Sequence, residues 1–185
     1  IGYHASTTNP RGVRAHTMSS GTLTAVKFNG VAVPEAVINA AIAAPGRIAQ
    51  MGEYQTLTFG EMDGSLSGRG EALLEACKAA RISARFSQNI LKDLWEKFVF
   101  LTSVAALTAA SRQRMAYIRS DPDARATLVR LLNEVTAVGR AVGVPLDPNL
   151  PEQRLKMIDG QNGESIASMA IDLLRGNRLE LPWLA

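Results

Sequence analysis

The chain has 185 residues, which is enough for one domain or slightly more. Hydrophobic residues make up 46% and charged residues 20%, an ordinary globular composition that argues against disorder. The net charge of +3 is a small basic excess spread along the chain, so nucleic acid is not expected as a main partner. The longest apolar stretch, Phe98–Leu107, is interrupted by Thr102 and Ser103 and is too short to span a bilayer, so no membrane partner is expected either.

Cysteine and histidine content bears on the compartment and on metal binding. A lone Cys77 cannot form an internal disulfide, which fits a reducing compartment. His4 and His16, together with that cysteine, cannot build a Cys/His zinc site, so no metal is expected. No basic-then-apolar leader opens the chain, and we expect a cytoplasmic protein. The first residue is Ile1 rather than Met, so we expect preceding residues to have been removed or left out.

The first thirty residues differ from the rest. Ile1–Gly30 is rich in Gly, Ser, Thr, Asn and Pro and has little periodicity, so it is interpreted as an irregular lead-in. Its single strand candidate is Leu23–Val26.

The next segment, up to Phe86, mixes strands with one helix. Ala36–Ile42 is apolar enough for a buried strand, although its alanines leave a helix open, and Ala44–Gly46 is a Pro-Gly turn. Two alternating runs joined around a glycine read as an antiparallel hairpin, and a loop, a helix and a further strand follow. These are Arg47–Met51 and Gln55–Phe59 with Gly52 between them, then Asp63–Gly68, Glu71–Ala80 and Ile82–Phe86.

From Ser87 onward the pattern is helical. Ser87 is a suitable N-cap for a long helix to about Arg112, and Phe98–Ala110 is apolar nearly all round, which predicts a buried central helix. Pro122 at the first position of a second helix follows Ser120 and Asp121. The second helix has an apolar stripe at Leu128, Leu131, Leu132, Val135, Val138 and Val142.

The remaining elements are short. Gly143–Pro148 ends the second helix, and helices are expected at Glu152–Asp159 and Glu164–Arg175, the latter ended by Gly176. Pro182 and Trp183 resemble the first turn of one more helix, which the end of the sequence truncates. The predicted fold class is therefore α+β, with a mixed part at residues 1–86 followed by an all-α part at residues 87–185.

The sequence lacks the glycine-rich motifs that bind nucleotides. The nearest approach to a G-x-G-x-x-G dinucleotide fingerprint is Gly68-Arg-Gly70, with Leu73 at the third glycine position, and no phosphate loop is present. Lys97 is the one residue that suggests a chemical role, because the helix face that follows it is apolar. Desolvation of a lysine lowers its pKa and makes it a usable general acid. The alternative is that Lys97 pairs with Asp93 at the wet end of the helix.

Three stretches of the sequence match motifs of one known family. Asp93-Leu-Trp-Glu-Lys-Phe98, followed by an apolar helix, is similar to the L-W-x-K-[LF] signature in the C-terminal portion of the ketopantoate reductase (2-dehydropantoate 2-reductase) family. Ile42–Ile48 with Leu57–Glu61 resembles the hairpin before its hinge, and Glu164–Glu180 resembles its S-M-x-x-D-[LI] helix and following glutamate. The resemblance covers roughly residues 36–185 in the right order and excludes the lead-in.

The resemblance implies a fold and a reaction. In that family a Rossmann domain carries NADPH, and an all-α C-terminal domain closes a cleft against it. Hydride reduces the 2-oxo carbon of ketopantoate to give pantoate for pantothenate and coenzyme A synthesis. Residues 1–86 would then include a remnant of the nucleotide-binding domain, and residues 87–185 would be a substrate and catalytic domain like that of 6-phosphogluconate dehydrogenase-type reductases.

The resemblance also assigns roles. Lys97 matches the lysine that protonates the developing alkoxide, Glu180 matches the glutamate that orients the lysine and the substrate hydroxyl, and Ser168 matches the serine that contacts the substrate carboxylate. Asparagines often follow the lysine by one and two turns in the family, but here these positions are Leu101 and Ala105, so the 2-oxo acid is left open. The cofactor-binding residues are unknown, because the glycine-rich fingerprint is missing from the chain.

Two functions remain in view. The first is the C-terminal part of an NADPH-dependent 2-oxo-acid reductase, whose visible chain alone would turn over little. Its expected partners are a small 2-oxo acid and, through the helical domain, a second copy of the chain. The alternative is a non-catalytic helical module derived from that family, which dimerises or binds a partner through an apolar surface.

Overall fold

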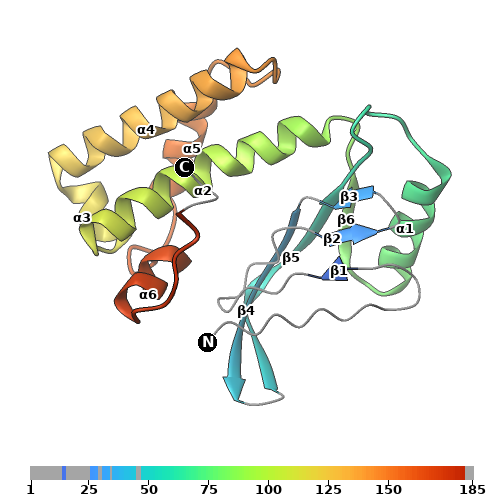
Figure 1. The fold of residues 1–185 in the computed structure, drawn as a ribbon, viewed down its shortest axis with the longest axis horizontal. Helices are drawn as coiled ribbons and strands as arrows, with labels where there is room; N and C mark the ends of the chain where they lie inside the picture. The colour runs from blue at the N-terminus through green and yellow to red at the C-terminus, as the bar shows by residue number, and fades with distance from the viewer. Residues whose placement is uncertain (1–13, 16–25, 29–30, 34, 45–46, 182–185) are drawn as a thin grey trace. The chain divides into compact units, whose positions relative to one another are not determined.

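A computed structural model of the chain describes residues 14–15, 26–28, 31–33, 35–44 and 47–181. The chain divides into two compact units, Ile1–Leu94 and Trp95–Ala185. The first unit contains two three-stranded sheets, one complete helix and the start of another, and the described residues of the second form helices joined by loops (Figure 1). The α+β class expected from the sequence is confirmed.

The larger sheet of the first unit orders its strands β4-β5-β6. Strand β4 (Glu35–Ala44) pairs antiparallel with β5 (Arg47–Phe59), from Glu35 opposite Thr58 to Ala44 opposite Arg47. Strand β6 (Ser83–Phe86) pairs with β5 in parallel. The smaller sheet holds β1 (Arg14–Ala15), β2 (Val26–Phe28) and β3 (Val31–Val33) in antiparallel order.

The predicted hairpin around Gly52 is wrong. Residues 47–59 form one strand, whose two halves both pair with β4. Ala40 lies opposite Gln50 and Ile38 lies opposite Gln55, with a register shift between them. The glycine therefore sits in a bulge of a continuous strand, which a local glycine signal does not distinguish from a turn. Two other predictions, the turn at Pro45-Gly46 and most of the lead-in, lie outside the described residues.

Helix α1 (Gly68–Ala79) follows β5 and precedes β6, as the sequence predicts. Its N-cap is Ser67, whose hydroxyl accepts a hydrogen bond from the Gly70 amide at 3.1 Å. Gly70 lies against the ring of Phe86, and a side chain there would overlap that ring. Phe86 in turn stacks on Phe59 with ring centroids 5.3 Å apart, which fixes the β5–α1–β6 segment as one packed motif.

Five helices follow β6. They are α2 (Ile90–Ser111), α3 (Met115–Ser120), α4 (Pro122–Ala141), α5 (Leu150–Asp159) and α6 (Ser168–Leu174). The predicted long helix, second helix and Glu152–Asp159 helix are confirmed, and α3 was not predicted. Ser87 is not the N-cap of α2, because the helix begins at Ile90 and the Asn89 side chain accepts from the Lys92 amide.

Helix α6 is shorter than the sequence suggests. It begins at Ser168 rather than Glu164, because residues 163–165 are used in backbone bonds to α3. The Met115 amide donates to the Ser165 carbonyl at 3.0 Å, and the Ala116 amide donates to the Gly163 carbonyl at 2.8 Å. The helix ends before Gly176, whose φ of 70° is the left-handed conformation that glycine adopts without strain. Pro182 and Trp183 lie outside the described residues.

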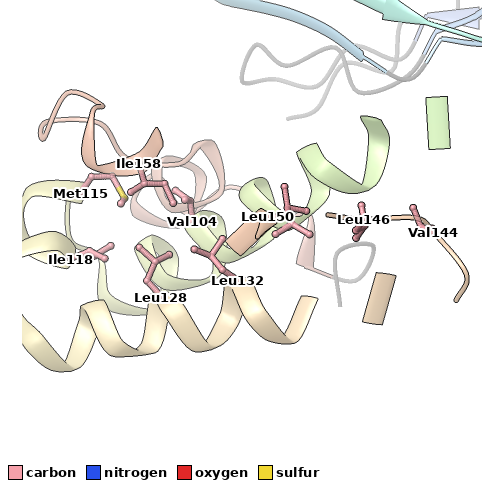
Figure 2. Close-up of a cluster of buried hydrophobic side chains, with 10 residues drawn as sticks. Val104, Met115, Ile118, Leu128, Leu132, Val144, Leu146, Leu150 and Ile158 are labelled. Carbon is pink, nitrogen blue, oxygen red and sulfur yellow. The ribbon is translucent and has the colours of Figure 1, made fainter. Parts of the chain in front are cut away.

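The core of the second unit lies among α2, α3, α4, α5 and the loop before α5 (Figure 2). Its side chains are nearly all aliphatic: Val99, Val104, Met115, Ile118, Leu128, Leu132, Val144, Leu146, Leu150 and Ile158. Leu128 and Leu132 belong to the predicted stripe of α4, but Val138 and Val142 are 50% and 63% exposed. The stripe leaves the core there because Gly139 turns inward against Trp95 and Leu146. Among the described helices, none is both long and apolar enough to cross a membrane.

Candidate active site on helices α2 and α6

Lys97 lies in the first half of α2, and its ammonium nitrogen is buried. The neighbouring Asp93 carboxylate is bound by other groups: Arg85 donates to it at 2.8 Å, and the Ser87 hydroxyl donates to its second oxygen. Glu96 is bound by Arg154 of α5 at 2.7 Å. The Lys97 ammonium nitrogen itself lies where water is scarce, because it is buried.

The helix face that follows Lys97 is apolar and small. Leu101 and Ala105 lie one and two turns after the lysine, and Ala105 and Ala109 are buried against Met169 and Ala170 of α6. With a rise of about 1.5 Å per residue, Ala105 lies roughly 12 Å along the axis from Lys97. Helix α6 therefore packs onto α2 two turns beyond the lysine.

Helix α6 carries Ser168 at its first position, directly before the two residues that pack on α2. The preceding segment is held by α3 through Gly163 and Ser165, and the Arg114 guanidinium donates to the Glu164 carbonyl at 3.0 Å. A side chain at Gly163 would lie 2.8 Å from the Arg119 guanidinium, so this loop is tightly packed as well. The position of Ser168 is thus set by neighbours on both sides.

The far end of α6 brings together two carboxyl groups. Asp172 is buried, and its carboxylate accepts a hydrogen bond from the side-chain amide of Asn177 at 2.9 Å. Burial raises the pKa of the Glu180 carboxyl, and the nearby charge of Asp172 adds to that rise. Glu180 consequently keeps its proton to a higher pH than an ordinary glutamate does.

Ser168 and Glu180 thus lie at and just beyond the two ends of α6, and α6 lies on the α2 face that follows Lys97. Sequence reasoning left two polar residues of this region without a role. Asp172 stands inside the quoted S-M-x-x-D motif, which was the available signal. Thr102 is one of the two residues that interrupt the apolar stretch of α2, and its hydroxyl is buried.

The described residues do not fit the diphosphate of a dinucleotide. The only parallel βαβ arrangement among them is β5–α1–β6, and a dinucleotide would place its diphosphate at the start of that helix. Glu61 already occupies this place: its carboxylate accepts from the Ser67 hydroxyl and from Arg69 at 2.6 and 2.7 Å. These bonds hold the pKa of Glu61 below its usual range, so the group is anionic and repels phosphate.

The described part of the chain holds no group of three or more His, Cys, Asp or Glu side chains that could bind a metal ion. Its polar residues near α2 and α6 include the Lys97 ammonium group, carboxyl groups and hydroxyls. These groups are suited to moving a proton and to binding a small anion.

Comparison with known protein families identifies two matching segments. The C-terminal domain of the ketopantoate reductases PanE/ApbA matches residues 89–185. The D-aminopeptidase family of peptidases M55 matches residues 1–48, which lie mostly outside the described residues.

Individual relatives agree with the first of these matches. An uncharacterised oxidoreductase of Bacillus subtilis, YkpB, is 29% identical over 143 residues, which is 77% of this chain and 47% of that protein. A 2-dehydropantoate 2-reductase of Mesorhizobium japonicum is 30% identical over 138 residues, covering 75% of this chain and 41% of its own length. The crystal structure of 2-dehydropantoate 2-reductase from Geobacter metallireducens matches with a TM-score of 0.71 and 25% identity, over 80% of this chain and 49% of that one. The chain spans less than half the length of each.

Proposed function

The chain belongs to the ketopantoate reductase PanE/ApbA family, whose C-terminal domain it contains, and from this we propose that it is the C-terminal part of an NADPH-dependent reductase of a small 2-oxo acid. Ketopantoate, reduced to pantoate for pantothenate synthesis in the cytoplasm, is the proposed substrate. The observation that carries the proposal is the buried ammonium nitrogen of Lys97 on α2, the helix whose Ala105 and Ala109 pack against α6.

Lys97 acts in this proposal as the general acid. Reduction of a 2-oxo carbon places negative charge on its oxygen, and an ammonium group in a water-poor site stabilises that charge and gives up its proton. Burial favours this role, since it strengthens the attraction between the ammonium group and the oxyanion.

Ser168 and Glu180 supply the other proposed contacts. The Ser168 hydroxyl, at the first turn of α6, would donate a hydrogen bond to the substrate carboxylate. The Glu180 carboxyl would orient the lysine and the substrate hydroxyl. Its raised pKa supports such a role, because carboxyl groups with shifted pKa values are concentrated at functional sites.

The reduced nicotinamide that supplies hydride is proposed to bind outside the described residues, since Glu61 fills the one helix start that follows a parallel strand there. Residues 87–185 are proposed as the substrate and catalytic domain, and residues 1–86 as including a remnant of the nucleotide-binding domain. A second copy of the chain is proposed as a partner of the helical domain.

The test joins residues 36–185 to the nucleotide-binding half of the Bacillus subtilis relative and follows the absorbance of reduced nicotinamide. The expected result is oxidation that depends on ketopantoate and proceeds faster with NADPH than with NADH. A folded protein that oxidises neither cofactor with ketopantoate or with other 2-oxo acids would contradict the proposal. That outcome would favour the alternative of a non-catalytic helical module.

A further inference from the structure

The other serine and threonine hydroxyls of α2 and α4 follow a common rule. They donate to the carbonyl four residues earlier, as Ser103 does to Val99 at 2.8 Å and Thr108 does to Val104 at 2.7 Å. Ser111 and Thr136 do the same at 2.7 Å each. This local bond satisfies a buried hydroxyl without any tertiary partner.

Thr102 departs from the rule. Its hydroxyl oxygen is buried and forms no hydrogen bond, although it lies on the same helix as Ser103 and Thr108. A buried polar group without a partner destabilises a folded protein, and such groups are rare enough that each needs an explanation. Here the chain leaves one hydroxyl unsatisfied among several that are satisfied.

The position of Thr102 on α2 indicates which part of the molecule its hydroxyl lies near. Residues 102, 105 and 109 follow the i, i+3, i+7 spacing of a single helix face. The other two members of this face, Ala105 and Ala109, are in contact with Met169 and Ala170 of α6, directly after Ser168. Thr102 therefore lies on the side of α2 that faces the start of α6, one turn closer to Lys97 than Ala105 is.

We propose that the Thr102 hydroxyl donates a hydrogen bond to the carboxylate of the 2-oxo acid, beside Ser168, an assignment that rests on the proposed function. A 2-oxo acid presents only acceptor oxygens at its carboxylate and keto group, and a hydroxyl can donate to either. Leu101 and Ala105 offer no side-chain donor, so Thr102 supplies one from the adjacent position.

The residue has a simple way to present its hydroxyl. Thr102 as a whole is only half-buried, so its accessible part is not the buried oxygen. Threonine in a helix uses two χ1 rotamers, and the change from one to the other carries the hydroxyl to a new position without moving the backbone. Substrate binding would select the rotamer in which the donor meets the carboxylate.

The test measures two properties of the 185-residue chain and its variants. The first is the midpoint of thermal unfolding without ligand. The second is the dissociation constant of ketopantoate and of 3,3-dimethyl-2-oxobutanoate, which lacks only the ketopantoate hydroxyl, from ligand-observed NMR. The variants are Thr102→Val, Thr102→Ser and, as a matched control, Thr108→Val.

Thr102→Val should weaken both ligands by about tenfold or more, the loss expected for one hydrogen bond to a charged group. It should leave the unfolding midpoint unchanged or raised, because no bond in the free chain is lost. Thr102→Ser should keep wild-type affinity. Thr108→Val should lower the midpoint, since it loses a bond to Val104, and leave both dissociation constants unchanged.

Several outcomes would overturn the assignment. Equal affinity of wild type and Thr102→Val for both ligands would remove Thr102 from the site while leaving the proposed function standing. Weakened binding of ketopantoate alone would show that the bond is not to the carboxylate. If the wild-type chain bound neither acid and the joined enzyme reduced neither, the proposed function would fail, and the Thr102 assignment would fail with it.

Discussion

Two polar groups of α2 are buried, which suggests that they contact a ligand. Ser103 and Thr108 donate to carbonyls of their own helix, whereas the buried Thr102 hydroxyl forms no hydrogen bond. The Lys97 ammonium nitrogen is buried on the same helix. A hydrophobic side chain would be the more stable choice at both positions. Their presence is explained if each group acts on a ligand.

Glu180 provides a prediction at the same scale. A carboxyl group whose pKa is raised on folding holds its proton more tightly in the folded chain than in the unfolded one. The unfolding free energy should therefore fall as the pH rises from below about 4.3, the ordinary glutamate value, through the folded pKa of Glu180. Glu180→Gln should lack this decrease, as measured by urea unfolding at a series of pH values.

A matched control for Glu180→Gln is Glu134→Gln on α4, where the residue is exposed. The control should reproduce the wild-type pH profile. If Glu180→Gln also reproduced it, the buried environment assigned to Glu180 would be incorrect.

The N-cap of helix α4 allows a prediction about the free energy of unfolding. Asp121 is its N-cap and accepts a hydrogen bond from the Ala124 amide at 2.8 Å, whereas the nearby Asp123 caps no amide. Asp121→Ala should lower the unfolding free energy by about 1 kcal/mol, the usual loss for an N-cap. Asp123→Ala, which also removes a carboxylate from the first turn, should have a smaller effect of about 0.3–1 kcal/mol through the helix dipole.

Chemical denaturation of the two aspartate variants measures the difference. Equal losses in both would mean that charge at the start of α4, rather than the cap bond, carries the stabilisation.

The elements that the sequence predicts well are those with local signals. The Asp121-Pro122 start of α4, the apolar run of α2 and the Gly176 stop after α6 are all encoded within a few residues. The errors arise where a distant partner decides the structure. Strand β5 continues through Gly52 because β4 pairs with both of its halves, and α6 starts late because α3 binds the Gly163 and Ser165 carbonyls.

The candidate site also has residues that the sequence identifies and residues that only the structure identifies. A lysine that enters an apolar helix is visible from sequence alone, and Ser168 and Glu180 were found through the family motif that contains them. Thr102 needed the structure, because a helical threonine with a satisfied hydroxyl and one without have the same sequence pattern. Asp172 also needed the structure, which shows that its carboxylate is buried, accepts a hydrogen bond from the Asn177 side chain and raises the pKa of Glu180.

At the scale of the whole molecule, the chain carries a family's helical domain but spans less than half the length of its curated relatives. Substrate contacts are proposed on α2 and α6, and the start of α1 is closed to phosphate by Glu61. In the proposed function, this chain supplies the acid and the substrate contacts, and a separate nucleotide-binding half supplies the reductant.

The most direct measurement is kcat/KM for ketopantoate reduction by the joined enzyme, compared among wild type, Lys97→Ala and Lys156→Ala, with and without added methylamine. Lys156 is an exposed lysine of α5 and should be replaceable without loss. Lys97→Ala should lower kcat/KM by about 10²–10⁴, and methylamine should restore part of the rate to that variant alone. A Lys97→Ala enzyme that reduces ketopantoate at the wild-type rate would contradict the account.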